Sequence, residues 1–200
     1  KRLTPILASG ERVKPSFITY VEAGCGFGGS CFPKDVKALV AHGRKFGEAM
    51  DLLSAVVEIN AAQPRQMIEL LKRHFPVPAG VKVTVLGLAF KPGTDDIRES
   101  PAITIIHELI ALGSQVAAFD PIAQKEAQKV FAKDQLSYKN SLRESLEGAD
   151  VVMLVTRWKE FEQLPELMAE ICPDAVLIDG RRMLPKGSVP KYEGIGLTNA

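Results

Sequence analysis

Downstream of residue 81, short apolar runs rich in β-branched residues alternate with segments whose apolar residues have helical spacing. The apolar runs predict strands at 82–88, 115–119, 150–156, 175–179 and 194–197. The segments with helical spacing predict helices at 102–112, 122–131 and 161–171. Strands that alternate with helices of about ten residues predict right-handed βαβ units and a parallel, doubly wound sheet.

A different pattern covers residues 36–76, where helical spacing continues almost without interruption. The apolar positions are Val36, Leu39, Val40, Leu52, Leu53, Val56, Val57, Met67, Ile68, Leu70 and Leu71. Pro64 breaks the series because it lacks an amide donor and crowds the carbonyl of Asn60, so we expect a kink or a restart there. A long helical region with apolar residues on more than one face needs partners, which makes it a candidate spine between two domains or a dimer surface.

Residues 1–35 show little apolar periodicity and contain many glycines and prolines, so they predict a loop region. Long loops in compact proteins are usually functional or disordered. The last part of this region, FGGSCFPKD at 27–35, has the chemistry of a site rather than that of a linker. We therefore divide the chain into a cysteine-bearing loop region (1–35), a helical spine (36–76) and a sheet domain (77–200).

Composition and charge narrow the class of protein. Of the 200 residues, 46% are hydrophobic, enough for a sizeable core, and the formal net charge is only +1. Such a balance gives no electrostatic footprint for nucleic acid or for an anionic membrane surface. No apolar run approaches the ~20 residues that span a bilayer, and the first residues lack the apolar stretch of a secretory signal.

The cysteines indicate the redox compartment of the protein, and the histidines bear on whether it binds a metal. Three cysteines, Cys25, Cys31 and Cys172, are an odd number, which argues against a disulfide framework and for a reducing compartment. We therefore expect a cytoplasmic α/β protein. The three histidines are scattered over predicted helices, and because none has a second ligand at metal-binding spacing we assign no metal site.

Charged side chains follow the predicted strands at their carboxyl ends, where α/β sheets bind ligands. Phe90, Lys91 and Arg98 follow the first strand, where the cations could bind a phosphate and the ring could pack on a base or sugar. Arg181 and Arg182 follow the fourth strand and could clamp a phosphate bidentately. Solvated surface charges explain these residues at least as well, and the first loop lacks the G-x-G-x-x-G sequence of a dinucleotide site.

Asp120 ends the second predicted strand and is followed by a proline. Dinucleotide-binding folds place a ribose-binding acid at this position. An Asp-Pro turn that closes the strand is the simpler interpretation.

Cys31 is the most informative single residue. It lies between a run of small residues, which would let a substrate carbon approach, and the Pro-Lys-Asp sequence that opens the predicted helix. A helix N-terminus and a nearby cation such as Lys34 favour the thiolate, which is the nucleophilic form, and Asp35 could orient or deprotonate a water. A buried, unreactive thiol is the commonest fate of a cysteine, and we expect it for Cys25 and Cys172.

Several segments together resemble the UDP-glucose/GDP-mannose dehydrogenase family. Residues 26–35, GFGGSCFPKD, are similar to its catalytic cysteine motif nearly residue for residue. Residues 87–100, which begin with GLAFK and end with IRES, are similar to the opening of its C-terminal domain. FDP at 119–121 and DGRR at 179–182 follow in the family's order, so the resemblance covers essentially the whole chain.

The resemblance implies an NAD-dependent enzyme that oxidises C6 of a nucleotide sugar to a carboxylate. It implies an N-terminal NAD domain, a long central helix that forms a homodimer, and a Rossmann-like C-terminal domain that binds the UDP-sugar. By motif position, Cys31 forms a thiohemiacetal and then a thioester, and Asp35 assists the water that hydrolyses the thioester. The implied cofactor contacts are Lys34 and Arg98. The implied substrate contacts are Arg12 from across the dimer, Gly26, Phe27, Gly28, Gly29, Phe90, Lys91 and an arginine of the pair Arg181 and Arg182.

The chain also departs from the family pattern. It lacks the glycine-rich NAD fingerprint and the catalytic lysine and asparagine that precede the cysteine in the family, so we expect a fragment that is inactive alone. A short insertion separates Arg12 from the cysteine motif. The SCFPKD sequence resembles the glucose and mannose branches more than the N-acetylated ones, and we expect UDP-glucose in preference to GDP-mannose.

Two other function classes remain open. One is a stand-alone nucleotide-binding or dimerisation module with an unreactive cysteine. The other is an acyl-handling cysteine enzyme, which needs a histidine partner. His42 is the nearest histidine, about three turns along the predicted helix from Cys31 and too far for a dyad.

Overall fold

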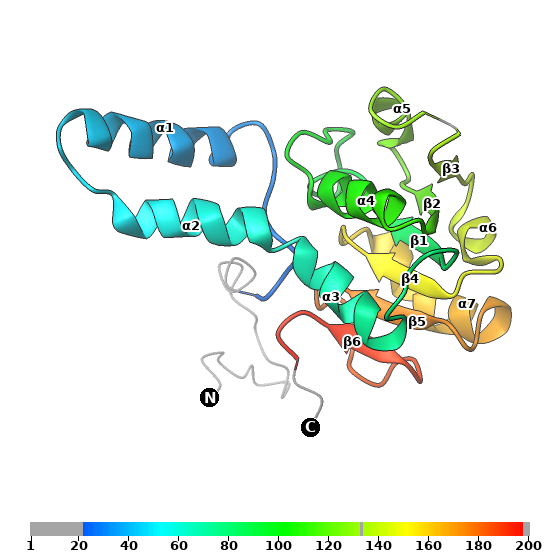
Figure 1. The fold of residues 1–200 in the computed structure, drawn as a ribbon. Helices are drawn as coiled ribbons and strands as arrows, with labels where there is room; N and C mark the ends of the chain where they lie inside the picture. The colour runs from blue at the N-terminus through cyan, green and yellow to red at the C-terminus, as the bar shows by residue number, and fades with distance from the viewer. Residues whose placement is uncertain (1–21, 133, 198–200) are drawn as a thin grey trace, which may run out of the picture.

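A single parallel sheet organises the computed structural model, which describes residues 22–132 and 134–197. In this part of the chain six strands follow the order β3-β2-β1-β4-β5-β6, and every neighbouring pair is parallel (Figure 1). The strands are β1 (Lys82–Leu86), β2 (Gln115–Phe119), β3 (Ser137–Tyr138), β4 (Val151–Leu154), β5 (Val176–Asp179) and β6 (Tyr192–Gly194). Since the strand order reverses between β1 and β4, the predicted Rossmann-like, doubly wound α/β fold is confirmed.

Most of the helices pack on the two faces of this sheet, and two others project away from it. The helices are α1 (Phe32–Lys45), α2 (Asp51–Ala62), α3 (Arg65–His74), α4 (Pro101–Ala111), α5 (Gln124–Ala127), α6 (Leu142–Leu146), the 3-10 helix η2 (Lys159–Gln163) and α7 (Leu164–Ile171). Side chains of α3 and α4 share one core with one face of the sheet, and those of α6 and α7 share a second core with the other face. In β1, for example, Val83 and Val85 join the first core and Leu86 joins the second. Burial on both faces explains why the strands are continuous apolar runs in the sequence.

The region predicted as a spine consists of three helices. α1 and α2 lie side by side and project away from the sheet, whereas α3 packs on it (Figure 1). Pro64 directly precedes α3, so the predicted restart at this proline is confirmed. Within the described chain α2 has no buried residue, while α3 buries Met67, Ile68, Leu70 and Leu71.

Some predicted boundaries differ from the structure. The prediction of a helix at 122–131 is wrong in extent, because the amides of Lys129 and Val130 donate to carbonyls three residues back and close the chain in turns after α5. The last strand, β6, begins earlier than the predicted 194–197. β3 and α6 were not predicted. α6 nevertheless has a capping signal, since the Ser141 hydroxyl accepts from the amide of Glu144 at 3.1 Å.

The predicted loop at residues 1–35 is described only from Glu22 onward, and Arg12 lies outside the described residues. From Glu22 to Cys31 the chain has no helix or strand, as predicted, and α1 begins at Phe32. We call residues 22–31 the cysteine loop. No helix in the described part of the chain is long and apolar enough to cross a membrane.

Candidate active site

The ends of β1 and β4 meet closely where the first loop leaves the sheet. Gly87 follows β1 with a φ of +92°, and a β-carbon there would lie 2.4 Å from the β-carbon of Thr156. Thr156 in turn donates its hydroxyl to the carbonyl of Ala89 at 2.6 Å. Glycine is therefore needed at position 87 so that the loop can cross the end of β4.

Asp120 is buried and holds the same loop from the other side. Its Oδ2 accepts from the amides of Leu88 (2.7 Å) and Ala89 (3.1 Å) and from the indole Nε1 of Trp158 (3.1 Å). Its Oδ1 accepts from two amides of its own turn, at 2.9 and 2.8 Å. The carboxylate thus closes the turn after β2, as the simpler interpretation of its Asp-Pro sequence predicted, and is already used by protein donors.

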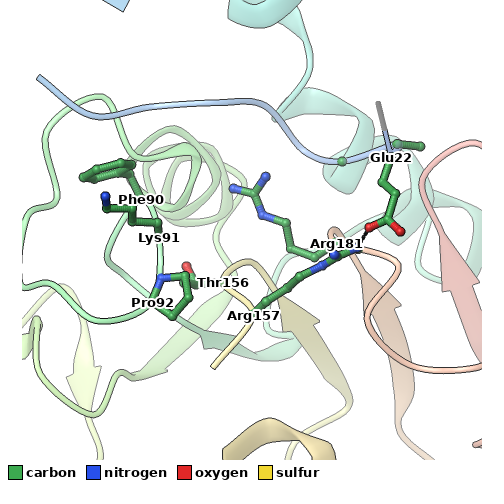
Figure 2. Close-up of a pocket in the computed structure, with 9 residues that line it drawn as sticks. Glu22, Phe90, Lys91, Pro92, Thr156, Arg157 and Arg181 are labelled. Atoms are coloured by element: carbon green, nitrogen blue, oxygen red, sulfur yellow. Dashed lines mark hydrogen bonds and ion pairs between the residues drawn. The ribbon is translucent and has the colours of Figure 1, made fainter. Parts of the chain in front are cut away.

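A pocket of about 230 Å³ opens between these strand ends and the start of the cysteine loop (Figure 2). It is lined by Glu22, Ala23, Gly24, Phe90, Lys91, Pro92, Thr156, Arg157 and Arg181. Figure 2 shows Phe90 and Lys91 on one side and Arg157 on the other, with the Arg181 guanidinium between them. The Lys91 ammonium lies over the Phe90 ring, 5.4 Å from its centroid. The structure therefore brings together Phe90, Lys91 and Arg181, which the sequence predicted from separate strand ends.

Arg181 connects the pocket to the cysteine loop. Its Nε donates to the carbonyl of Val155 at 2.6 Å, and its Nη1 donates to the carbonyl of Gly26 at 2.8 Å. The Arg181 amide donates to Asp179, a buried carboxylate at the end of β5, at 2.8 Å. The guanidinium is therefore held in one orientation in the pocket wall.

Arg157 and Glu22 are pocket residues that the sequence analysis did not single out. Arg157 donates from Nε to the carbonyl of Arg181 at 2.9 Å, and its Nη2 forms an ion pair with Glu22 at 2.5 Å. The ion pair joins the start of the cysteine loop to the segment after β4. A signal for Arg157 was present, because it follows a predicted strand at the carboxyl end, as Lys91 does. Glu22 has no comparable signal.

Two of the arginines predicted at the strand ends, Arg98 and Arg182, lie outside this pocket. Arg98 binds Asp96 through two hydrogen bonds, Nε to Oδ1 at 2.9 Å and Nη2 to Oδ2 at 2.7 Å. This pairing lowers the pKa of the Asp96 carboxyl and raises the pKa of the Arg98 guanidinium. Arg182 has a φ of +52° and donates to the carbonyl of Ile195 at 3.3 Å. Of the two neighbouring arginines, Arg181 is therefore the one that lines the pocket.

The sheet domain holds the cysteine loop through backbone hydrogen bonds at two points. The amide of Cys25 donates to the carbonyl of Gly180 at 2.8 Å, just after β5. The amide of Gly29 donates to the carbonyl of Arg98 at 2.9 Å, in the loop after β1. The loop is thereby fastened to the same edge of the sheet that forms the pocket.

The end of α2 holds the loop through two side-chain amides. Gln63 donates from Nε2 to the carbonyl of Gly24 at 2.9 Å. Asn60 accepts from the amide of Phe27 at 2.8 Å and donates to the carbonyl of the same residue at 3.0 Å. The loop is therefore clamped between the sheet domain and the helical spine.

The two adjacent glycines of the motif have a packing role. A β-carbon on Gly28 would lie 2.2 Å from the carbonyl oxygen of Glu99, and one on Gly29 would lie 2.8 Å from the Phe90 ring. We expected small residues here so that a substrate could approach. In the structure, Gly28 and Gly29 have no side chain to separate the loop from Phe90 and the backbone of Glu99, so the loop packs directly against both.

Cys31 is exposed and forms the N-cap of α1, the loop-to-helix boundary that the sequence predicted. The hydroxyl of Ser30 lies 3.7 Å from its Sγ. In the first turn of α1, the exposed side chains of Lys34 and Asp35 form an ion pair at 3.0 Å. The hydrogen bond to Asp35 and its negative charge raise the pKa of Lys34. The thiol, the cation and the carboxylate thus lie within one turn of the chain, as their spacing in the sequence predicted.

The other two cysteines are buried, as expected for structural thiols. Burial raises the pKa of both Cys25 and Cys172. The Cys25 thiol lies 4.0 Å from the carbonyl of Val155, to which it donates. The described residues include no cluster of three or more histidine, cysteine or carboxylate side chains that could hold a metal ion.

The sheet edge does not fit the diphosphate of a dinucleotide. Such sites present free backbone amides in a glycine-rich turn after the first strand. Here the amides of Leu88 and Ala89 donate to Asp120, so they are already used. Lys34 and Arg98, the cofactor contacts that the resemblance implies, are exposed cations that are each paired with a carboxylate.

A parallel sheet in this order, with a cationic pocket at the carboxyl ends of β1, β4 and β5, is typical of nucleotide-binding domains of the Rossmann-like class. Two family models match the chain. The model for the UDP-binding domain of the UDP-glucose/GDP-mannose dehydrogenase family matches residues 84–186, and the model for the central domain of the same family matches residues 6–62. The chain therefore belongs to the UDP-glucose/GDP-mannose dehydrogenase family, as its motifs indicated.

Individual relatives agree with this assignment. UDP-glucose 6-dehydrogenase AglM of Haloferax volcanii is 40% identical over 176 residues, which are 88% of this chain and 40% of that protein. A UDP-glucose dehydrogenase structure from Pyrobaculum islandicum has a TM-score of 0.80 at 34% identity and covers 90% of this chain and 40% of that one. A ternary complex of GDP-mannose dehydrogenase from Pseudomonas aeruginosa has a TM-score of 0.73 at 28% identity and covers 89% of this chain and 41% of that one. The chain thus spans about two fifths of the length of the relatives it matches.

Proposed function

We propose that this chain is the C-terminal part of an NAD-dependent UDP-glucose 6-dehydrogenase, which oxidises C6 of the sugar to a carboxylate in two steps. One observation carries the proposal. Arg181 lines the cationic pocket and also donates to the carbonyl of Gly26 in the cysteine loop. A phosphate-binding side chain and the loop that bears an exposed thiol therefore belong to one continuous wall.

The pocket supplies groups that a nucleoside diphosphate sugar needs. Lys91 and Arg181 place positive charge around it, whereas Arg157 is paired with Glu22, and guanidinium groups bind phosphate oxygens bidentately. The Phe90 ring offers an apolar surface for the base or the sugar. At about 230 Å³ the pocket is smaller than the ~300–1,000 Å³ usual for ligands of drug size. It therefore takes part of the ligand, and the remainder extends along Gly26 to Gly29 of the cysteine loop.

Cys31 is the proposed nucleophile. Once the C6 alcohol has become an aldehyde, the thiolate adds to the carbonyl carbon and the carbonyl oxygen takes up a proton, which gives a thiohemiacetal. Loss of a hydride from C6 and of the hydroxyl proton gives a thioester. Water then attacks the thioester carbon, the C–S bond breaks, and the carboxylate and the thiol are released. NAD, when bound, accepts the hydride in each oxidation.

Asp35 and Lys34 have proposed roles beside the thiol. Asp35 lies one helical turn from Cys31 and its carboxylate is exposed, so we propose that it orients the water of the last step. Lys34 and Arg98 are the proposed contacts of this chain with NAD. Each is paired with a carboxylate in the structure, so binding of an anionic cofactor would compete with those pairs.

The remainder of the enzyme is proposed to hold most of the NAD site, so we propose that the chain alone is inactive. We propose that residues 1–35, 36–76 and 77–200 form the cysteine-loop region, the dimer-forming spine and the UDP-sugar domain. The spine supports a homodimer because Leu52 and Ile59 of α2 are 78% and 64% exposed. Pairing with the same helix of a second copy would cover these side chains.

UDP-glucose is proposed in preference to GDP-mannose. The Haloferax volcanii and Pyrobaculum islandicum proteins, at 40% and 34% identity, carry UDP-glucose in their names, and the GDP-mannose dehydrogenase is 28% identical. Competition between UDP-glucose and GDP-mannose for the complete enzyme tests this choice. Clear selectivity for GDP-mannose would contradict it.

Replacement of the thiol tests the proposed chemistry. In the complete enzyme, Cys31→Ala should abolish release of the sugar acid while UDP-glucose still binds. Cys31→Ser should accumulate a bound intermediate, because a hydroxyl is a poorer nucleophile at neutral pH. Cys172→Ser is the matched control, since it changes a buried thiol far along the chain. Release of sugar acid at the wild-type rate by Cys31→Ala would rule out the covalent mechanism.

A further inference from the structure

We propose that Asn60 is a positioning residue that sets the place of the cysteine loop, and with it Cys31, relative to helix α2. This inference rests on the proposed function of Cys31. Asn60 lies in the last turn of α2 and is half-buried between that helix and the loop.

The contact between Asn60 and Phe27 is reciprocal. The amide of Phe27 donates to Oδ1 of Asn60 at 2.8 Å, and Nδ2 of Asn60 donates to the carbonyl of Phe27 at 3.0 Å. A carboxamide has the same donor and acceptor as a peptide group, so this pair resembles the exchange of two hydrogen bonds between paired strands. Two bonds to one residue determine the orientation of the loop as well as its distance from α2.

The loop needs such an anchor because the glycines around Phe27 leave its backbone free to adopt many conformations. Phe27 has a glycine on each side, and Gly26 has a φ of +115°. Glycine loses more conformational freedom on ordering than any other residue, so external bonds must stabilise its conformation. Hollows of about 400 and 470 Å³ are each lined in part by both Phe27 and Asn60, so close side-chain packing does not replace the two hydrogen bonds.

A displacement of Phe27 would displace Cys31 in two ways, through the loop backbone that precedes Cys31 and through the side chain of the residue that follows it. Phe27 precedes Cys31 along the loop, and its ring packs edge-on against Phe32, the residue after Cys31, with 4.8 Å between centroids. Ile59, the neighbour of Asn60, is 64% exposed on the surface proposed for the dimer. Asn60 therefore connects the proposed dimer helix to the part of the loop next to the proposed nucleophile, while Gln63 binds the loop farther away, at Gly24.

Two variants and a control in the complete enzyme test the proposal. Asn60→Leu is nearly isosteric and removes both hydrogen bonds. It should lower kcat by about tenfold to a hundredfold, as misplacement of a reacting group does, and should change KM for UDP-glucose by less than about twofold. Hydrogen exchange of the Phe27 amide should be at least about tenfold faster, because its acceptor is lost. Gln66→Met, at an exposed carboxamide on α3, should change none of these quantities.

Asn60→Asp distinguishes positioning from general stability. At neutral pH the new carboxylate accepts from the Phe27 amide but cannot donate to its carbonyl, so kcat should fall. Once protonated, the carboxyl group both donates and accepts, which restores the reciprocal pair. The ratio of kcat for Asn60→Asp to kcat for the wild type should therefore rise as pH falls from about 7 to about 5.

The outcomes separate this proposal from the proposed function. If Asn60→Leu keeps wild-type kcat while Cys31→Ala is inactive, the positioning role is wrong and the covalent chemistry stands. If Cys31→Ala stays active, the chemistry is wrong, and unchanged exchange at Phe27 in Asn60→Leu would further refute the anchor itself. Parallel losses of kcat, UDP-glucose binding and thermal stability in Asn60→Leu, with no pH-dependent recovery in Asn60→Asp, would show a merely structural residue.

Discussion

The sheet domain and the α1–α2 pair differ in how completely each buries its apolar residues. All four residues of β4 and all four of β5 are buried, with helices on both faces of the sheet. α2, by contrast, has no buried residue in the described chain, and its Leu52 is 78% exposed. Since apolar burial is the main favourable term in folding, we expect the sheet domain to carry most of the stability, whereas α1 and α2 leave apolar side chains exposed.

The cysteine loop lies at the junction of these two regions. Its amides at Cys25 and Gly29 donate to carbonyls of the sheet domain, and Asn60 and Gln63 at the end of α2 bind its backbone. The position of Cys31 therefore depends on both regions, although the pocket itself is built mainly from the sheet domain.

Matched leucine truncations should give the largest difference between the two regions. Leu177→Ala, at a fully buried position in β5, should lower the free energy of unfolding by about 2–5 kcal/mol, because it leaves a cavity. Leu52→Ala, at an exposed position, should change it by no more than about 0.5 kcal/mol in the monomer. Urea denaturation at low protein concentration measures both. Equal effects would contradict the division into a self-stabilised and an unpartnered region.

A β-carbon in the cysteine loop should have the next largest effect, on activity rather than on folding. Gly28→Ala would place the new carbon 2.2 Å from a backbone oxygen of Glu99, so the loop must move. A displacement of that kind should lower kcat of the complete enzyme by about a hundredfold while the sheet domain keeps its melting temperature. Ala111→Ser is the control, because it adds one atom at an exposed position in α4, away from the loop. Similar activities for the two variants would show that the loop tolerates displacement.

A charged side chain introduced on α2 should have a smaller effect than the two preceding changes, and it should affect only the formation of the proposed homodimer. Leu52→Asp should weaken the proposed homodimer by more than about tenfold, because a carboxylate would have to be desolvated in an apolar contact. Its free energy of unfolding as a monomer should stay near that of the wild type. Sedimentation velocity over a range of concentrations measures the dimer, with Glu48→Ala in the exposed turn before α2 as the control. An unchanged dimer would move the interface away from this helix.

The sheet domain was the more predictable of the two regions. Buried parallel strands leave continuous apolar runs, so β1, β2, β4 and β5 were found at nearly their observed positions. β3 has two residues, too few for any pattern, and α5 was overextended because its following turns keep helical spacing. Local periodicity reports burial along one segment, and it fails where the segment is very short.

The site was predictable where chemistry follows a strand end and less so where it depends on tertiary contact. Lys91 and Arg181 could be placed on one rim because parallel strands present their carboxyl ends together. The ion pair between Arg157 and Glu22 joins segments far apart in the chain, and no local sequence pattern predicts that these two residues meet. The anchoring role of Asn60 has the same origin, because a helical asparagine carries no signal of the loop it will bind.

Calorimetric titration of the chain with UDP, UDP-glucose and NAD tests the central claim most directly. The claim is that the carboxyl ends of β1, β4 and β5 form a site for a UDP-sugar and not for a dinucleotide. UDP and UDP-glucose should bind, NAD should give no measurable heat, and Lys91→Ala should weaken UDP binding by about tenfold to a hundredfold. Lys82→Ala, at the opposite end of β1, should leave binding unchanged. Tight binding of NAD without any response to UDP, or UDP binding that is unaffected by Lys91→Ala, would contradict the claim.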